Sequence, residues 1–422
     1  MAELFMNEEG RKLQNNDFDR QMDSTFYDDY NISQILLEML MQNQNISNEA
    51  LIAHAQLLYK QLTFERDLSS YTEFRLHKAM LLYVPPILLV LGVIGNVLSF
   101  FILRHKTMTR QSTTLFLAVL SIADSLVLFI GLFRKWIGEI TGLDIQHESM
   151  FLCKTITVLG YSISHYSVWL IVAVTIERFI VVCRPLQASR YCKQKRARKV
   201  VLVMIFIFLA INAHLFWTVE LTEQSMNRKT VLRCDAGPKF VEFIDRIWPW
   251  IDLVLYSLFP LVILLFFNTH IIRQVVRATA GRDILQNGPL MKVDTRRNTK
   301  DANLKLTIML LTISFTFLAT TVPMNVVMIA SVVWRNEMDN PKQFAKLVLI
   351  RTISELLMYL NHSINFFLYC ATGQKFRNIV LRMICGRSTS NISNFSDHSQ
   401  HLYCSRANNN CNGHKSENET AF

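Results

Sequence analysis

The sequence has few charged residues and lacks the patterns that mark a catalytic or metal centre. Only 18% of its 422 residues are charged, against about a quarter in soluble domains, and 51% are hydrophobic. It contains no Cys and His cluster with metal-ligand spacing, no glycine-rich phosphate loop, and no evident Ser, His and Asp triad. These absences give no support to an enzyme or a metalloprotein, and the composition indicates that much of the chain lies outside water.

Long apolar runs fill most of the chain after residue 80. A helix needs roughly 20 apolar residues to cross a bilayer. Seven segments meet this length, and we expect an all-α membrane protein, a seven-transmembrane helix bundle. The predicted spans are Met80–Leu103, Thr114–Phe133, Leu152–Val182, Val200–Thr218, Trp248–Ile272, Leu304–Val333 and Phe344–Tyr369.

Basic residues concentrate in three of the links between these spans. The links after the first, third and fifth spans carry the Lys and Arg clusters, so the positive-inside rule places them in the cytoplasm. We therefore expect a multi-pass protein of the plasma membrane with its N-terminus outside. The net charge of +11 then reflects topology, and a nucleic-acid partner is not expected.

Three regions follow from this topology: an extracellular tail at 1–79, a seven-helix domain with a membrane-surface helix at 80–385, and a cytoplasmic disordered tail at 386–422. The first tail holds two N-glycosylation triplets, at Asn31 and Asn45, although such triplets also arise by chance in Asn-rich chains. No signal-peptide core precedes the first span, which we expect to act as the insertion signal.

The eight cysteines divide by the same topology. Six of them fall in or near the cytoplasm, where thiols stay reduced, which leaves Cys153 and Cys234 on the oxidising side. The sequence therefore predicts one disulfide, from the start of the third span to the loop before the fifth.

Several motifs lie in order along the spans. They are Gly95-Asn96-Val97 in the first span, Leu120 to Asp124 in the second, Glu177-Arg178-Phe179 ending the third, Pro260 and Pro323 in the fifth and sixth, and Asn365 to Tyr369 closing the seventh. With Cys153 lying 178 − 153 = 25 residues before Arg178, the set resembles the rhodopsin-like G-protein-coupled receptors from about Met80 to Cys385.

The resemblance implies roles for the buried polar residues. Glu177 and Arg178 are expected to form a switch with Asn365 and Tyr369 at the G-protein end, although Arg178 could instead snorkel to lipid head groups. Asn96, Asp124 and Asn365 are expected to share an interior network that could hold a sodium ion, since the family commonly places a cation at this Asp. The alternative is a purely structural set of hydrogen bonds.

The chain also departs from the family pattern. Thr320-Thr321-Val322-Pro323 replaces the usual Cys-Trp-x-Pro, while Phe317 is retained, and Asn268 stands at the usual tyrosine of the fifth span. These changes predict a modified activation route.

The outer mouth of the bundle indicates the kind of ligand. In receptors for biogenic amines, which resemble one another here, an Asp occupies the position of Gly160. A salt bridge from this position to an amine ligand is therefore excluded. Mixed charges with aromatic surface suit a peptide, and the candidate ligand residues are Arg134, Tyr161, Asp252, Arg351 and Glu355. Alternatively, Arg134 or Arg351 could simply pair with Glu355.

The run from Asn361 to Arg377, NHSINFFLYCATGQKFR, resembles invertebrate neuropeptide receptors of the FMRFamide and myosuppressin type. The expected function is a receptor that transmits binding of an extracellular neuropeptide to a heterotrimeric G protein. The rival functions are a membrane transporter, which would show inverted repeats, and an orphan seven-helix protein that takes a non-peptide ligand or does not signal.

The end of the chain predicts contacts with the inner leaflet. Gly373–Cys385 has apolar residues at helical spacing with basic residues between them, which predicts an amphipathic helix on the membrane surface. Cys385 at its end is a candidate palmitoylation site, against the alternative of an inert thiol. The Ser-rich tail beyond it could serve receptor kinases and arrestin.

Glycosylation tests the predicted orientation. Asn31 and Asn45 should carry sugar, whereas Asn391 and Asn418, which also begin acceptor triplets, should not, because they would face the cytoplasm. Mass shifts after glycosidase treatment of Asn→Gln variants measure this, and sugar on Asn391 or Asn418 would overturn the orientation.

Overall fold

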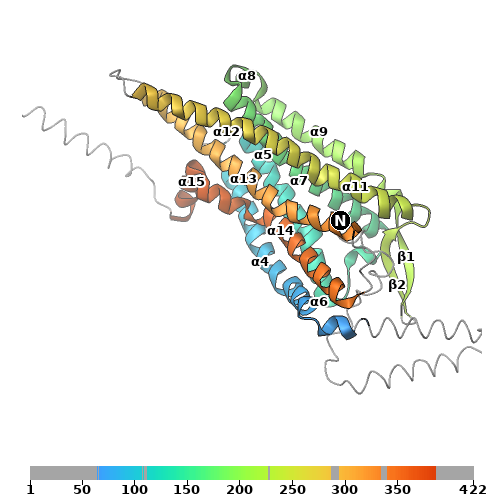
Figure 1. Cartoon of the computed structure of the whole chain (residues 1–422). Helices are drawn as coiled ribbons and strands as arrows, with labels where there is room; N and C mark the ends of the chain where they lie inside the picture. The colour runs from blue at the N-terminus through green and yellow to red at the C-terminus, as the bar shows by residue number, and fades with distance from the viewer. Residues whose placement is uncertain are drawn as a thin grey trace, which may run out of the picture.

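The computed structural model describes residues 64, 66–106, 108, 112–226, 229–286, 294–333 and 340–385. The predicted sites Asn31 and Asn45 and the tail after residue 385 lie outside these residues. The described chain forms a long helical bundle with a β hairpin at one end and two short helices, α8 and α15, at the other (Figure 1). We call these the hairpin end and the α15 end.

Seven rods of helix make up the bundle, which confirms the predicted all-α seven-helix fold. The elements are α4 (Thr72–Leu103), α5 (Ser112–Val127), η3 (Leu128–Phe133), α6 (Arg134–Thr141), η4 (Ile145–His147), α7 (Met150–Cys183), α8 (Pro185–Tyr191), α9 (Gln194–Asn212), α10 (Leu215–Thr218), β1 (Val219–Met226), β2 (Lys229–Ala236), η5 (Phe243–Ile247), α11 (Trp248–Leu253), η6 (Val254–Leu258), α12 (Phe259–Gln286), α13 (Asp294–Val333), α14 (Pro341–Thr372) and α15 (Gln374–Cys385).

Six of the described helical segments are long and apolar enough to cross a membrane, judged on length and composition. The seventh rod, α14, is not among them, because it carries Arg351 and Glu355 in one half and buried Asn361, His362 and Asn365 in the other. It nevertheless packs along α4 and α13. A polar seventh helix is tolerated because its neighbours, rather than lipid, satisfy its polar groups.

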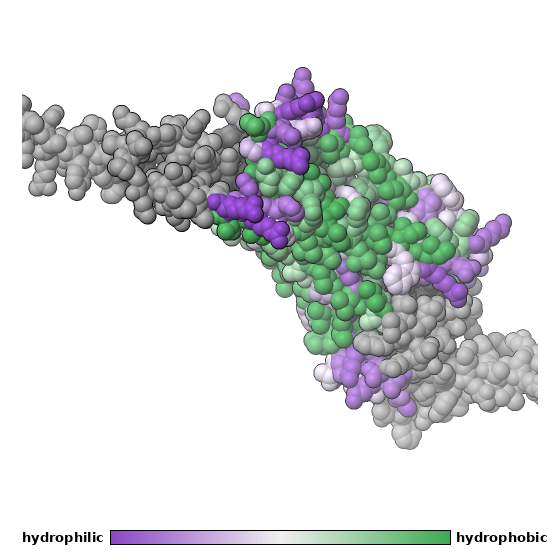
Figure 2. Space-filling view, turned by 45° about the horizontal axis from the view of Figure 1, so that its top comes forward, coloured by the Kyte–Doolittle hydropathy of each residue, from purple (hydrophilic) through white to green (hydrophobic). Residues whose placement is uncertain are grey.

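The surface carries a wide apolar zone with polar ends (Figure 2). Large side chains such as Phe101, Phe206 and Val262 are more than half exposed along the helices. In water such a surface would be unstable, so it fits a lipid environment and a multi-pass membrane protein.

The helix α7 is the centre of the bundle, since it contacts α5, α9, α12 and α13. Its buried residues Val168, Leu170 and Val172 join the main apolar core with Leu117 of α5 and Phe317 of α13. The Ser149 side chain caps the start of α7 by accepting from the Leu152 amide.

All seven helical rods begin earlier in the chain than the predicted spans. The first span begins at Thr72 rather than Met80, and the fifth begins at Phe243 rather than Trp248. Apolar runs mark the part of a helix that lies in lipid, whereas the backbone hydrogen bonds continue into polar residues beyond it.

The hairpin of β1 and β2 was not predicted. Its strands pair antiparallel, with Leu221 opposite Cys234. Cys234 forms the predicted disulfide with Cys153 of α7, and their Cα atoms lie 5.4 Å apart. Leu215, Val219 and Trp248 pack around this bridge, which therefore fixes the hairpin across the end of the bundle.

Removing the disulfide should lower the amount of folded protein. Its partners are 81 residues apart, and closing a loop of that size contributes roughly 4 kcal/mol in the chain-entropy model. Cys153→Ser, Cys234→Ser and the double variant should reduce surface expression to a similar extent, as measured by flow cytometry on an N-terminal epitope tag.

Cys183→Ser is the matched control, because Cys183 is a free, half-buried cysteine at the other end of α7. It should express normally. Normal surface levels of Cys153→Ser would contradict the structural role of the bridge.

Candidate functional site

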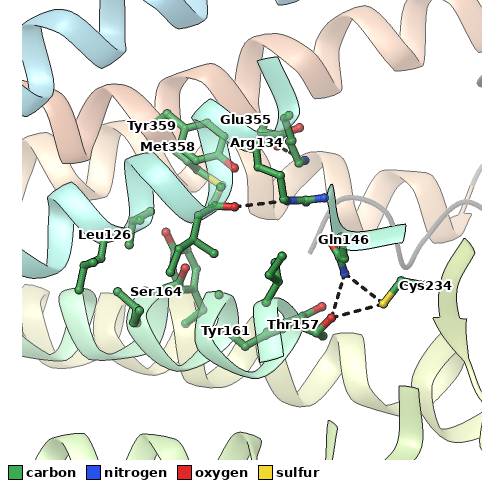
Figure 3. Close-up of a pocket in the computed structure, with 18 of the residues that line it drawn as sticks. Leu126, Arg134, Gln146, Thr157, Tyr161, Ser164, Cys234, Glu355, Met358 and Tyr359 are labelled. Carbon is green, nitrogen blue, oxygen red and sulfur yellow. Dashed lines mark hydrogen bonds and ion pairs between the residues drawn. The ribbon is translucent and has the colours of Figure 1, made fainter. Parts of the chain in front are cut away.

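A cavity of about 200 Å³ opens between the helices near the hairpin (Figure 3). Residues of η3, α6, α7, η6, α13, α14 and the hairpin line it. Its walls carry Tyr161, Ser164, Tyr256, Met358 and Tyr359, so most of its surface is aromatic or apolar with a few polar groups. Such a composition is typical of a ligand site.

Two ion pairs stand on one wall of this cavity. Arg134 binds Asp144, and Lys135 binds Glu355 of α14. Arg134, Lys135 and Glu355 all line the cavity. Of the predicted ligand residues, Arg134, Tyr161 and Glu355 therefore meet there. Asp144 is thus the ion-pair partner of Arg134. Glu355 pairs with Lys135 and also lies within electrostatic reach of Arg351. The alternative in which Arg351 is the partner of Glu355 stays a prediction.

Asp252 and Arg351 do not line the cavity, although both were predicted as ligand residues. Asp252 is 1% exposed, and its Oδ1 lies 3.1 Å from Nε2 of His165, which is fully buried on α7. The ring of His165 stacks on Phe208, and its Nδ1 lies 3.2 Å from the Asn212 side chain. A buried carboxylate needs such a partner, so Asp252 joins the fifth rod to α7 rather than facing the ligand.

The floor of the cavity reaches a polar cluster in the middle of the bundle. Asp124 of α5 is 1% exposed and accepts hydrogen bonds from Ser167 Oγ at 2.6 Å and Asn365 Nδ2 at 2.7 Å. His362 Nδ1 lies 2.8 Å from its Oδ1. Asn96 Nδ2 donates to the backbone carbonyl of His362 at 3.0 Å. The structure thus brings Asp124, Asn96 and Asn365 together.

Ser167 and His362 were missed as members of this cluster. Both are polar residues inside long apolar runs, which is the signal that identified Asp124. His362 alone among these residues also lines the cavity. It therefore connects the candidate ligand site to the polar core.

Near the α15 end, a hydroxyl group of α5 joins Glu177 to Arg178. Glu177 accepts from Ser112 and from Thr113, the latter at 2.5 Å, and Arg178 donates to Thr113 Oγ1. No ion pair joins Glu177 to Arg178 among the described side chains. The hydroxyl of Thr113 bridges them instead, because two adjacent helical side chains point in different directions.

Other predicted switch residues lie around this position. Tyr369 is 1% exposed and packs against Phe376 of α15. Thr175 Oγ1, on α7, lies 3.1 Å from Ser314 Oγ on α13. The first contact holds α15 against α14, and the second holds α13 close to α7. The helix α15 ends at Cys385, whose side chain lies outside the described part of the structure.

The family profile described as 7 transmembrane receptor (rhodopsin family) matches residues 95–369. The FMRFamide receptor of Drosophila melanogaster is 27% identical over 71% of this chain and 53% of its own length. The FMRFamide peptide receptor of Caenorhabditis elegans is 23% identical over 73% and 71%. The thyrotropin-releasing hormone receptor of Mus musculus is 25% identical over 72% and 79%.

This chain thus aligns with about half the length of the Drosophila receptor and with more than two thirds of the other two. The profile match covers most of the chain and includes Asp124, Arg178 and Asn365. With the seven-helix bundle, the disulfide and the interior polar cluster in place, the chain belongs to the rhodopsin family of seven-transmembrane receptors, which are not enzymes.

Proposed function

We propose that this protein is a receptor for an extracellular neuropeptide and passes the signal to a heterotrimeric G protein. The observation that carries the proposal is the cavity at the hairpin end, where the Glu355 carboxylate stands near aromatic and thioether surface. The names of the insect and nematode relatives favour a peptide of the FMRFamide kind, which ends in Arg and an amidated Phe.

Two carboxylates line the cavity, Asp235 of the hairpin and Glu355 of α14, and we assign the arginine of such a peptide to Glu355. It lies beside Tyr359 and Met358 on α14, whose side chains offer apolar surface for the phenylalanine ring (Figure 3). Lys135 holds Glu355 in the structure, so the incoming guanidinium would replace one cation by another. This exchange of partners avoids leaving a partly buried carboxylate without a cation.

The proposed orientation puts the hairpin end outside the cell and the α15 end in the cytoplasm of a plasma-membrane protein. The disulfide at the hairpin end suits an oxidising compartment. At the other end, Arg104 and Arg184 follow directly after α4 and α7, and α8 and α9 add further basic residues. This arrangement follows the positive-inside rule.

Signal transfer would release the contacts at the α15 end. We infer that α13 moves away from α7 when a peptide binds, which breaks the contact between Thr175 and Ser314, and that Arg178 then exchanges its bond to Thr113 of α5 for a contact in the space that opens. The freed guanidinium would then contact the G protein. Receptor kinases and arrestin at the C-terminal tail, and a lipid anchor at Cys385, complete the proposed set of partners.

Two other functions remain as rivals. A transporter would carry substrate across vesicle membranes, and an orphan seven-helix protein would respond to no peptide. Cells that express the chain, screened against a neuropeptide library with calcium and cAMP readouts, separate these cases. The proposal predicts a response to an amidated peptide that disappears in Arg178→Ala at matched surface level.

The switch predicts opposite effects for two substitutions. Arg178→Ala should leave peptide binding within a few fold while it abolishes nucleotide exchange. Thr113→Val should raise basal exchange, because it removes the bridge between Glu177 and Arg178. Exchange is measured by GTPγS binding to membranes.

Thr269→Val is the matched control, since Thr269 is an exposed Thr on α12 that bonds only to Leu265 of its own helix. It should leave basal exchange unchanged. Normal signalling by Arg178→Ala would show that the switch interpretation is wrong.

The ligand contact is tested with paired peptides. A charge-assisted hydrogen bond contributes roughly 1.5–3 kcal/mol, so Glu355→Gln should weaken an Arg-containing peptide about tenfold to a hundredfold. Its citrulline analogue, which keeps the shape and loses the charge, should change little. Dose–response curves for both peptides measure the difference.

Asp252→Asn serves as the comparison, because Asp252 is buried against His165 away from the cavity. It should affect both peptides equally through the packing of the helices. Equal shifts for both peptides in Glu355→Gln would mean that Glu355 supports the fold and does not read the arginine.

A further inference from the structure

Three polar side chains from two other helices surround the carboxylate of Asp124. Ser167 of α7 and His362 of α14 approach Oδ1, at 2.6 and 2.8 Å, and Asn365 of α14 approaches Oδ2 at 2.7 Å. All four side chains are at most 2% exposed. A carboxylate that carries no proton only accepts hydrogen bonds, and in that arrangement His362 is the donor through Nδ1.

This donor set does not fit a sodium ion. A hard cation takes oxygen ligands whose lone pairs face it. Around Asp124 the groups that point at the carboxylate are an O–H and two N–H groups, and the imidazole Nδ1 lies 2.8 Å from Oδ1, the oxygen that Ser167 also contacts. The oxygens of the Asn96 and Asn365 side chains have no protein partner, and a water molecule can satisfy each of them.

We infer that the imidazole of His362 takes the place of the sodium ion that related receptors commonly hold at this Asp. The neutral Nδ1–H tautomer and the imidazolium both present the required hydrogen, so the inference depends on no particular charge. It is independent of the proposed peptide ligand. It replaces the expectation of a sodium site at Asn96, Asp124 and Asn365.

Replacing a sodium ion by the His362 imidazole changes how the polar cluster at Asp124 responds to salt. A sodium ion comes and goes with the salt concentration, whereas His362 is fixed to α14. The same side chain lines the ligand cavity, so a change at the cavity floor reaches Asp124 through one residue. The receptor should therefore be insensitive to sodium as such.

Thermal unfolding of the purified full-length receptor tests this. The wild type should have the same Tm in sodium chloride and in choline chloride at equal concentrations. His362→Ser should unfold at a Tm roughly 2–4 °C higher in sodium chloride than in choline chloride, once sodium exceeds its Kd about tenfold. Adding Asp124→Asn to His362→Ser should abolish that difference.

His77→Ser is the matched control, because His77 is another buried histidine, bonded to Thr352 away from Asp124. It should gain no sodium dependence. His362→Ala, which also clears the place next to Oδ1, replaces His362→Ser if the latter does not give a folded sample.

Two results would overturn the inference. The first is a wild-type Tm that sodium raises above its value in choline, with the difference lost in Asp124→Asn. The second is a folded His362→Ser or His362→Ala receptor that remains as insensitive to sodium as the wild type.

Discussion

One buried carboxylate constrains the centre of this receptor. Asp124 lies in α5 at 1% exposure, and isolated there it would cost several kcal/mol. Its partners Ser167, His362 and Asn365 come from α7 and α14, so the carboxylate is satisfied only when three helices are in register. The apolar core alone would tolerate small sliding movements of these helices. The polar cluster selects one arrangement of them.

The two functional ends of the bundle depend on this arrangement. His362 lies both in the wall of the ligand cavity and against Asp124. Asn365, which also contacts Asp124, lies one turn before Tyr369 on α14, toward the α15 end. At that end Thr113, on the same helix as Asp124, bridges Glu177 and Arg178. The helices that share Asp124 therefore also carry the ligand contacts and the restraint on Arg178. A shift of α14 against α5 would be felt at both ends.

Much of this could be predicted from the sequence, because hydropathy and charge are strong signals in a membrane protein. The spans, the disulfide and the meeting of Asp124 with Asn365 follow from length, topology and buried polarity. Asp252 could not be placed, since the π-helical stretch Phe243–Ile247 precedes it. A π turn holds more residues than an α turn, so it rotates every later side chain away from the face that a regular period predicts.

Pairings between helices were harder to predict for another reason. Thr113 and His362 act through partners 65 and 238 residues away in sequence, and periodicity along one helix does not specify the neighbour that it meets. The hairpin of β1 and β2 was not predicted either, because its strands lie over the end of the bundle and contain no long apolar run. Polar residues within a span indicate that a partner exists, and only the fold identifies it.

The central claim is that the cluster at Asp124 couples the ligand cavity to the opening at Arg178. It is tested most directly by an electron-paramagnetic-resonance distance between nitroxides on Cys183 of α7 and an introduced Ile308→Cys on α13, an exposed position, with the other free thiols replaced by Ser. An activating peptide should lengthen this distance in the otherwise native receptor and leave it unchanged in Asp124→Asn, although the peptide still binds. An equal lengthening in Asp124→Asn would contradict the account.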